Sequence, residues 1–218
     1  MILERFVNGR ARSNAYVFAP DPDRAVLIDP GVGAAPRVAR FVHDGGLRPV
    51  GILLTHGHPD HTWTSRELSE RYGVPVFLHR ADWRWLDDPA TGGHVPLVRL
   101  AGLAVGRLRR VRPARLQEAD GSVEVAGVAF RVLHTPGHTA GSSCFIAGDI
   151  CFVGDTAFAG GVGHTVYPGG RGEALRRSIG DGLLGLSDEV RLLPGHGPET
   201  TMARERAGYE RFARGRGD

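Results

Sequence analysis

The fold is decided by residues 55–61, which read Thr-His-Gly-His-Pro-Asp-His. Three imidazoles and one carboxylate fall within six residues, directly after an apolar run at residues 50–54. That run predicts a short buried strand, and the glycine and proline that follow it predict a tight loop. Because strand ends in an α/β sheet present ligands to a cleft, the sequence predicts a functional loop here.

The spacing of the four polar side chains predicts two metal sites side by side. His56 and His58 lie two apart, so in an extended loop they can point to the same side and share one ion. Asp60 and His61 follow near the start of a predicted helix and would face a neighbouring position. A loop of solvated histidines is the alternative interpretation, but four ligand-type residues at this density rarely accumulate for packing alone.

Three further strand ends are each predicted to deliver a ligand-type residue between turn-forming residues. These are His138 after Pro-Gly, Asp155 after Gly, and His196 after Pro-Gly. With the loop at 55–61 the count is five histidines and two aspartates, enough for two ions with open positions. Every candidate ligand is nitrogen or oxygen, which favours catalytic zinc, iron or manganese over a cysteine-rich structural site.

Composition favours one globular domain over residues 1–218. The chain is 41% hydrophobic and 23% charged, which is ordinary for such a domain. A net charge of +3 without a basic tail predicts no nucleic-acid partner. The chain has neither a signal-peptide core nor a membrane-spanning run, so we expect a cytoplasmic protein without membrane association. Cys144 and Cys151 are expected as buried thiols, with a cross-strand disulfide as the alternative.

Hydrophobic periodicity predicts two halves, each with strands followed by helices, in an α/β domain with sheets packed between outer helices. In the first half we predict strands at 15–18, 25–28 and 74–78, and helices at 34–44, 62–72 and 81–86. In the second half we predict hairpins at 123–133 and 143–153, a strand at 190–193, and helices at 173–184 and 200–214. Asp29, at a strand end, is expected to cap a turn or to support a metal ligand.

An irregular, arginine-rich stretch is predicted at about residues 87–120, where prolines and glycines break any long element. Its arginines are Arg99, Arg107, Arg109, Arg110, Arg112 and Arg115. Two interpretations stay open at this level: a loop that attracts an anionic substrate, or a solvated surface.

Together these residues resemble the metallo-β-lactamase-fold hydrolase superfamily. The HxHxDH pattern at 56–61 is followed in order by His138, Asp155 and His196, and the match also includes residues 14–18, 27–31 and 193–197. Within the superfamily the chain looks most like the short glyoxalase II-like (hydroxyacylglutathione hydrolase-like) branch, which lacks the helical C-terminal domain. The motif is specific for fold and metal site and weak for substrate.

The resemblance implies a four-layer αββα sandwich with two divalent metal ions at the strand ends. Zinc is the expected metal, with iron or manganese as alternatives. One ion would be held by His56, His58 and His138, and the other by Asp60, His61 and His196, with Asp155 bridging the two. A metal-bridging hydroxide would attack the carbonyl of a thioester or related small ester, and Asp60 would also act catalytically by accepting a proton from the attacking water.

The chain departs from the glyoxalase II-like pattern at His164, where that branch usually carries arginine or lysine. This departure weakens the case for glutathione as the thiol carrier, while His164 and Tyr167 remain expected substrate contacts. The resemblance leaves two alternative activities open, a mononuclear iron persulfide dioxygenase and a lactonase. A small-molecule substrate is expected in each case. An apolar face with Tyr209 and Phe212 on the last helix would serve either a homodimer or docking onto the domain.

Overall fold

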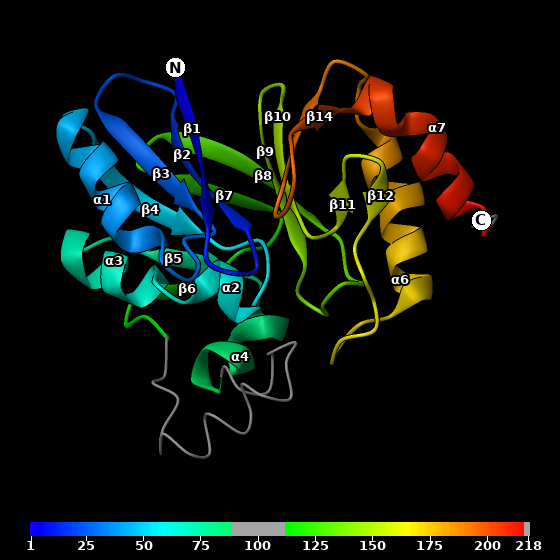
Figure 1. Ribbon diagram of the computed structural model, residues 1–218, viewed down its shortest axis with the longest axis horizontal. Coiled ribbons are helices and arrows are strands. Elements are labelled where there is room, and N and C mark those ends of the chain that lie inside the picture. The colour runs from blue at the N-terminus through cyan, green and yellow to red at the C-terminus, as the bar shows by residue number, and fades with distance from the viewer. Residues whose placement is uncertain (89–111, 216–218) are drawn as a thin grey trace.

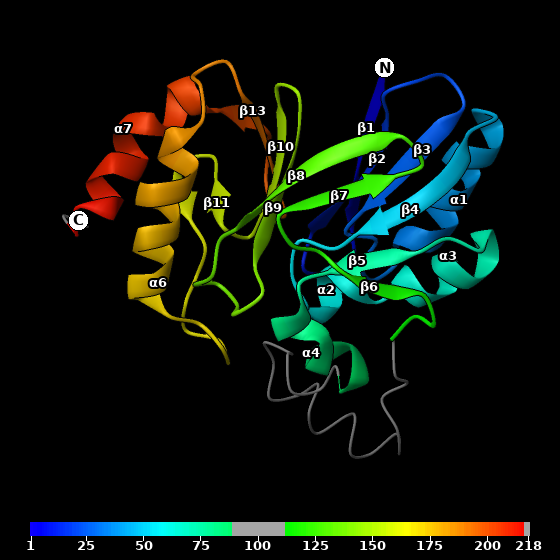
Figure 2. The same ribbon diagram turned by 180° about the vertical axis from the view of Figure 1, so that it is seen from behind.

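The computed structural model describes residues 1–88 and 112–215, which form two six-stranded sheets packed face to face between two layers of helices (Figure 1). Helices α1 and α3 cover the outer face of the N-terminal sheet, and α6 and α7 cover the other (Figure 1). In the reverse view β7 and β8 lie between the α6–α7 layer and the N-terminal sheet (Figure 2). The predicted αββα sandwich is confirmed.

The N-terminal sheet has the order β1-β2-β3-β4-β5-β6, antiparallel from β1 to β3 and parallel from β3 to β6. Its strands are β1 (Ile2–Asn8), β2 (Ser13–Ala19), β3 (Arg24–Ile28), β4 (Arg48–Leu53), β5 (Val76–Leu78) and β6 (Leu116–Glu118). The intervening helices are α1 (Ala34–Asp44), α2 (Pro59–Thr62), α3 (Ser65–Tyr72) and α4 (Trp83–Asp87), the last preceded by the 3₁₀ turn η1 (Arg80–Asp82). Parallel strands connected by helices bring several strand ends to one edge.

The C-terminal sheet has the order β14-β13-β10-β9-β8-β7, in which only the β10–β13 pair is parallel. Its strands are β7 (Ser122–Val125), β8 (Val128–His134), β9 (Ser143–Ala147), β10 (Ile150–Gly154), β13 (Arg191–Pro194) and β14 (Thr200–Thr201). The small ribbon β11 (Ala157–Phe158) with β12 (Gly161–Val162) precedes α6 (Gly172–Arg177), the turns η2 (Ser178–Gly182) and η3 (Leu183–Gly185), and α7 (Met202–Ala213).

Three apolar layers account for the packing. The central layer lies between the sheets and contains Tyr16, Phe18, Phe130 and Phe152 in edge-to-face ring contacts. The outer layers bury the helices, as α1 shows by packing its Val38 and Val42 face onto the sheet. The central layer is therefore what holds the two sheets together.

Two predicted helices differ from the observed ones. The helix predicted at 62–72 is divided into α2 and α3, because the Thr64 amide and hydroxyl both donate to the Pro30 carbonyl, at 3.1 and 2.8 Å. The helix predicted at 173–184 is α6 followed by the turns η2 and η3, where Gly180, Gly182 and Gly185 weaken regular helix.

The arginine-rich stretch has regular secondary structure at both of its ends. Helix α4 reaches Asp87, and β6 forms the edge of the N-terminal sheet within the stretch predicted to be irregular. The side chain of Arg112 donates to Asp87 at 2.7 Å and lies over the Trp83 ring. Residues 89–111 lie outside the described residues, and with them Arg99, Arg107, Arg109 and Arg110.

Other features of the described chain agree with the sequence. Cys144 and Cys151 are buried free thiols. Tyr209 is buried and donates to the Phe158 carbonyl at 2.9 Å, so this face of α7 docks onto the domain. The homodimer stays a prediction. None of the helices within residues 1–88 and 112–215 has the length and apolar character needed to cross a membrane.

The contact between the sheets leaves no room for a side chain at Gly51 in β4, because a Cβ there would overlap Val125 of β7. We therefore expect Gly51→Ala to lower the free energy of unfolding by about 1–3 kcal/mol through overpacking. Urea denaturation measures the loss. Gly185→Ala is the matched control, since a Cβ at Gly185 meets open space, and its effect should stay within about 0.5 kcal/mol. Equal stability of the two variants would contradict this packing.

Candidate metal centre

Seven side chains from five segments of the chain meet at one end of the two sheets. His56 and His58 follow β4, and Asp60 and His61 belong to α2. The other three follow β8, β10 and β13 in turn, and they are His138, Asp155 and His196. The structure thus brings together all seven residues that the sequence indicated as ligands.

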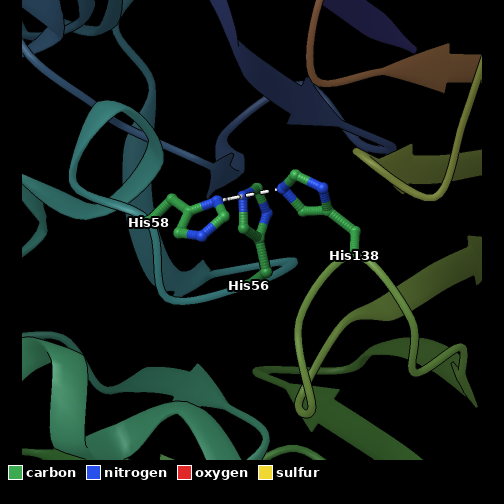
Figure 3. A group of neighbouring side chains, drawn as sticks. All are labelled: His56, His58 and His138. Carbon is green, nitrogen blue, oxygen red and sulfur yellow. Dashed lines mark hydrogen bonds between the residues drawn. The ribbon is translucent and has the colours of Figure 1, made fainter. Parts of the chain in front are cut away.

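The first cluster consists of three buried imidazoles, His56, His58 and His138 (Figure 3). The Nδ1 atom of His58 lies 3.1 Å from Nε2 of His56 and 2.9 Å from Nε2 of His138. Ligands of a tetrahedral zinc ion lie about 3.3 Å apart when the Zn–N distance is about 2.0–2.1 Å. The three ring nitrogens therefore have the spacing of a metal-binding set.

The second cluster combines one carboxylate with two imidazoles. The Nε2 atoms of His61 and His196 are 3.2 Å apart, and Oδ2 of Asp60 lies 3.4 Å from each of them. His61 is fully buried, whereas Asp60 and His196 are partly exposed. This cluster therefore opens towards solvent on the His196 side.

The carboxylate of Asp155 lies between the two clusters. Its Oδ2 atom is 3.5 Å from Nε2 of His138 and 3.5 Å from Nε2 of His196, and Oδ1 is 3.6 Å from Nε2 of His61. Oδ1 is buried and has no hydrogen-bond partner among the described residues. A buried carboxylate oxygen without a donor is costly, and a cation on each side would satisfy it.

Asp29 supports both clusters from behind. Its Oδ2 atom accepts a hydrogen bond from the Thr55 hydroxyl at 2.6 Å and lies 3.2 Å from Nδ1 of His61. The same hydroxyl lies 3.0 Å from Nδ1 of His56, and Oδ1 of Asp29 accepts from the Thr55 amide at 2.7 Å. Of the two roles expected for Asp29, the structure favours support of the ligands, since such contacts fix the orientation of an imidazole.

His138 is oriented by a backbone group. Its Nδ1 atom lies 2.7 Å from the carbonyl oxygen of His164, which only accepts, so Nδ1 carries the proton and Nε2 keeps its lone pair. The ring of His164 is exposed. Tyr167 is nearer the centre, with its ring 6.2 Å from the rings of both His58 and His138. Substrate contact by His164 and Tyr167 stays a prediction.

Sequence reasoning missed Asp82, which joins the two loops of the first cluster. This fully buried carboxylate accepts hydrogen bonds from the Gly57 amide, the Thr139 hydroxyl and the Gly141 amide, at 2.9, 2.7 and 2.9 Å. Gly57 lies between His56 and His58, and Thr139 follows His138. Asp82 thereby fixes the distance between loops that are about eighty residues apart in the chain.

Trp85 acts on the same cluster from the same segment. Its ring stacks on His58 with 5.0 Å between centroids and 10° between planes. Asp82 and Trp85 are three residues apart, which places both on one face of the helical segment. Trp85 is buried against this ring, and the sequence alone did not show that its packing partner is a candidate ligand.

The pKa values separate the two clusters. Burial, and then the positive charges of His61 and His58, hold the pKa of His56 well below its ordinary value. Burial also lowers the pKa of His138, although the Asp155 carboxylate opposes the shift. These two imidazoles are therefore unprotonated at neutral pH, which is the form that binds metal.

In the second cluster the carboxylates outweigh burial. Burial alone would lower the pKa of His61 and His196, but Asp60 and Asp155 raise both, and His61 most. Burial would raise the pKa of Asp60, but the charge of His61 and the hydrogen bond with His196 hold it far below its ordinary value. Asp60 is therefore ionised, and a metal ion here would compete with protons on two imidazoles.

This geometry can be compared with known proteins. The family profile described as "Metallo-beta-lactamase superfamily" matches residues 8–208. The chain belongs to this superfamily.

Two relatives and two crystal structures show which members the chain resembles. Probable metallo-hydrolase YqgX of Bacillus subtilis is 35% identical over 94% of this chain and 94% of its own length. Hydroxyacylglutathione hydrolase GloC of Haemophilus influenzae is 31% identical over 89% of this chain and 90% of its own. The structure of BLEG-1 B3 metallo-beta-lactamase has a TM-score of 0.83 at 32% identity, covering 94% of this chain and 97% of that one. TTHA1623 in a di-iron-bound form has a TM-score of 0.78 at 34% identity, covering 93% and 96%.

The family and the clusters agree on the general chemistry. The superfamily and the metallo-hydrolase relatives identify a metal-dependent hydrolase, and the His and Asp clusters provide the divalent metal-binding groups. This chain spans nearly the whole length of both relatives.

Asp82 gives a test of how the first cluster is positioned. The Gly57 and Gly141 amides donate to different oxygens of Asp82, and in Asp82→Asn one of these oxygens becomes an NH₂ group, which cannot accept. We expect the variant to lower the free energy of unfolding by about 2–3 kcal/mol, because one buried backbone donor is left unsatisfied. Thermal unfolding measures the change. In Asp87→Asn, on the same helical segment, only a partly exposed ion pair is lost, at a cost below about 1 kcal/mol. A loss no greater in Asp82→Asn than in the control would contradict the role of Asp82.

Proposed function

We propose that this protein is a dinuclear metal-dependent hydrolase of a thioester or related small ester. The observation that carries the proposal is the Asp155 carboxylate, whose two oxygens reach imidazoles of both clusters within 3.6 Å. A bridging carboxylate is the feature that distinguishes a two-metal site from two separate sites.

We assign one ion to His56, His58 and His138, and the other to Asp60, His61 and His196, with Asp155 shared. Divalent ions held there would supply Lewis-acid activation of water and of the substrate carbonyl. Asp60, ionised because of its lowered pKa, is the group we assign to the proton of the attacking water. Tyr167, beside the first cluster, is proposed to line the substrate site, with His164 at its exposed margin.

The relatives support this assignment in two ways. The name of the Haemophilus influenzae relative, hydroxyacylglutathione hydrolase, supports a thioester substrate. The di-iron-bound form of TTHA1623 supports two ions and keeps iron beside zinc and manganese as the metal. We also propose that the protein acts on a small molecule in the cytoplasm and has no nucleic-acid or membrane partner. A β-lactam belongs in the same substrate screen, because BLEG-1 is a B3 metallo-beta-lactamase, and a lactone belongs there because the resemblance leaves a lactonase open.

A second candidate function is mononuclear iron chemistry on a persulfide. Oδ2 of Asp155 lies 3.5 Å from Nε2 of His138 and so places a carboxylate beside the imidazoles of the first cluster, and a mixed imidazole–carboxylate set suits a single Fe(II) with open positions. In that enzyme the second cluster would have no metal to hold. Metal content per chain and oxygen consumption separate the two candidates.

The role of His196 tests the dinuclear proposal. Protein purified without chelator should hold about two zinc, iron or manganese ions per chain, and His196→Ala should reduce this to about one. Thioester hydrolysis should fall at least about 100-fold in the variant, since one metal is worth several kcal/mol of transition-state stabilisation. Elemental analysis and a thiol-release assay give the two readouts.

His43→Ala is the control for this experiment, because His43 is an exposed imidazole on α1 that belongs to neither cluster. It should keep both ions and full activity. A single iron in the wild type, with oxygen consumed and metal content unchanged in His196→Ala, would establish the dioxygenase instead.

The pKa shifts predict the order in which the ions are lost in acid. Because their pKa values are raised, His61 and His196 keep their protons to higher pH. A metal ion at the second cluster therefore competes with these protons, whereas a metal ion at the first cluster meets no such competition. Dialysis from about pH 8 towards about pH 5 should therefore remove one ion before the other. Metal analysis at each pH would show a step near one ion per chain. A single simultaneous loss would contradict the difference between the clusters.

A further inference from the structure

A hollow of about 320 Å³ lies beside the second cluster, between the start of the chain and the loop that carries His196. Arg5 and Arg12 contribute charge to its lining, and Val7, Ala11 and Pro198 contribute apolar surface. His196 itself forms part of the lining, so the hollow and the second cluster share this residue. A ligand that reaches His196 therefore has space to extend towards the two arginines.

The turn between β1 and β2 is tied closely to the second cluster. The Ser13 hydroxyl donates to the Asp60 carbonyl at 2.7 Å, and the Asn14 amide donates to the Gly195 carbonyl at 2.7 Å. Ser13 also forms an isolated antiparallel bridge with His196. The position of Arg12, directly before Ser13, is thus fixed relative to Asp60 and His196.

The positive charge in the hollow has no carboxylate partner within the part of the chain that the structure describes. Neither Arg5 nor Arg12 forms an ion pair with a carboxylate in residues 1–88 and 112–215. Arg5 donates to the Gly197 carbonyl at 2.6 Å, which holds it against the His196 loop. Two guanidinium groups at the edge of a hollow, without a carboxylate partner, attract anions.

Arg12 also has an unfavourable backbone conformation. Its φ of 56° lies in the left-handed region, which favours glycine or asparagine over a long side chain. Gly9, in the same turn, has φ of 62° and shows what the turn geometry prefers. Residues held in such conformations cluster at ligand sites, and Arg12 is one of the residues that line the hollow.

We propose that Arg12, assisted by Arg5, binds an anionic group at the end of the substrate, a carboxylate or a phosphate, whose scissile carbonyl lies at the metal centre. The proposal rests on the hydrolase function proposed above and adds the substrate class: anionic esters or thioesters with an apolar segment along Val7, Ala11 and Pro198. Guanidinium groups recognise both anions by paired hydrogen bonds.

The test compares two thioesters that are identical except that one has a free terminal carboxylate and the other has a neutral carboxamide in its place. In Arg12→Gln we expect KM for the carboxylate thioester to rise about tenfold with kcat unchanged, and KM for the carboxamide thioester to stay the same. Arg10→Gln is the matched control, because Arg10 is an exposed arginine in the same turn that does not line the hollow. It should behave as the wild type with both substrates.

A rise in KM of equal size for both thioesters, or no rise for either, would overturn the proposal. A matching thioester with a terminal phosphate distinguishes the two anions, and the larger effect of Arg12→Gln identifies the preferred one. Should the wild type hydrolyse none of these compounds, the hydrolase function fails on its own. The subsite is then judged by calorimetric binding of the free carboxylic acid, which Arg12→Gln must weaken and Arg10→Gln must not.

Discussion

The structure depends on how the nitrogen and oxygen ligand atoms of seven side chains, with their lone pairs, are placed around the Asp155 carboxylate. Seven side chains with nitrogen or oxygen ligand atoms meet in a region where most of them are buried, and Oδ1 of Asp155 has no donor among the described residues. Such an arrangement is unfavourable unless positive charge is placed within it. The fold provides the framework, because each cluster takes two ligands from the N-terminal half and one from the C-terminal half. Asp155 lies between the two clusters, where ligands from both halves meet.

The supporting contacts are organised in the same way. Asp29 reaches one imidazole of each cluster, directly at His61 and through Thr55 at His56. Asp82 connects the loop of His58 with the loop of His138. Neither carboxylate needs to touch a metal ion to matter, because a ligand that is free to rotate loses much of its affinity. The centre is thus held by two buried carboxylates behind it as well as by the ligands in front.

Much of the fold and all of the candidate ligands could be predicted from the sequence, because these signals are local. The loop at 55–61 carries four candidate ligands within six residues, and the other three each follow a recognisable apolar strand. Asp82 and Trp85 could not be found in this way, since their partners lie 25 to 59 positions away. The break between α2 and α3 was missed for a related reason: it is set by a hydrogen bond from Thr64 to Pro30, and periodicity does not report such tertiary contacts. The left-handed backbone conformation of Arg12 could not be predicted either, because an arginine in a turn does not indicate such a conformation.

The ion pair between Arg112 and Asp87 has a consequence for how this chain can change over evolution. It joins the end of α4 to the segment that leads into β6, with 2.7 Å between Nη1 of Arg112 and Oδ2 of Asp87. The entropy of closing a loop grows only slowly with its length, so adding or removing residues between two joined positions costs little stability. We therefore expect the number of residues between the two positions to vary more readily than the length of α4, which holds Trp85 against the first cluster.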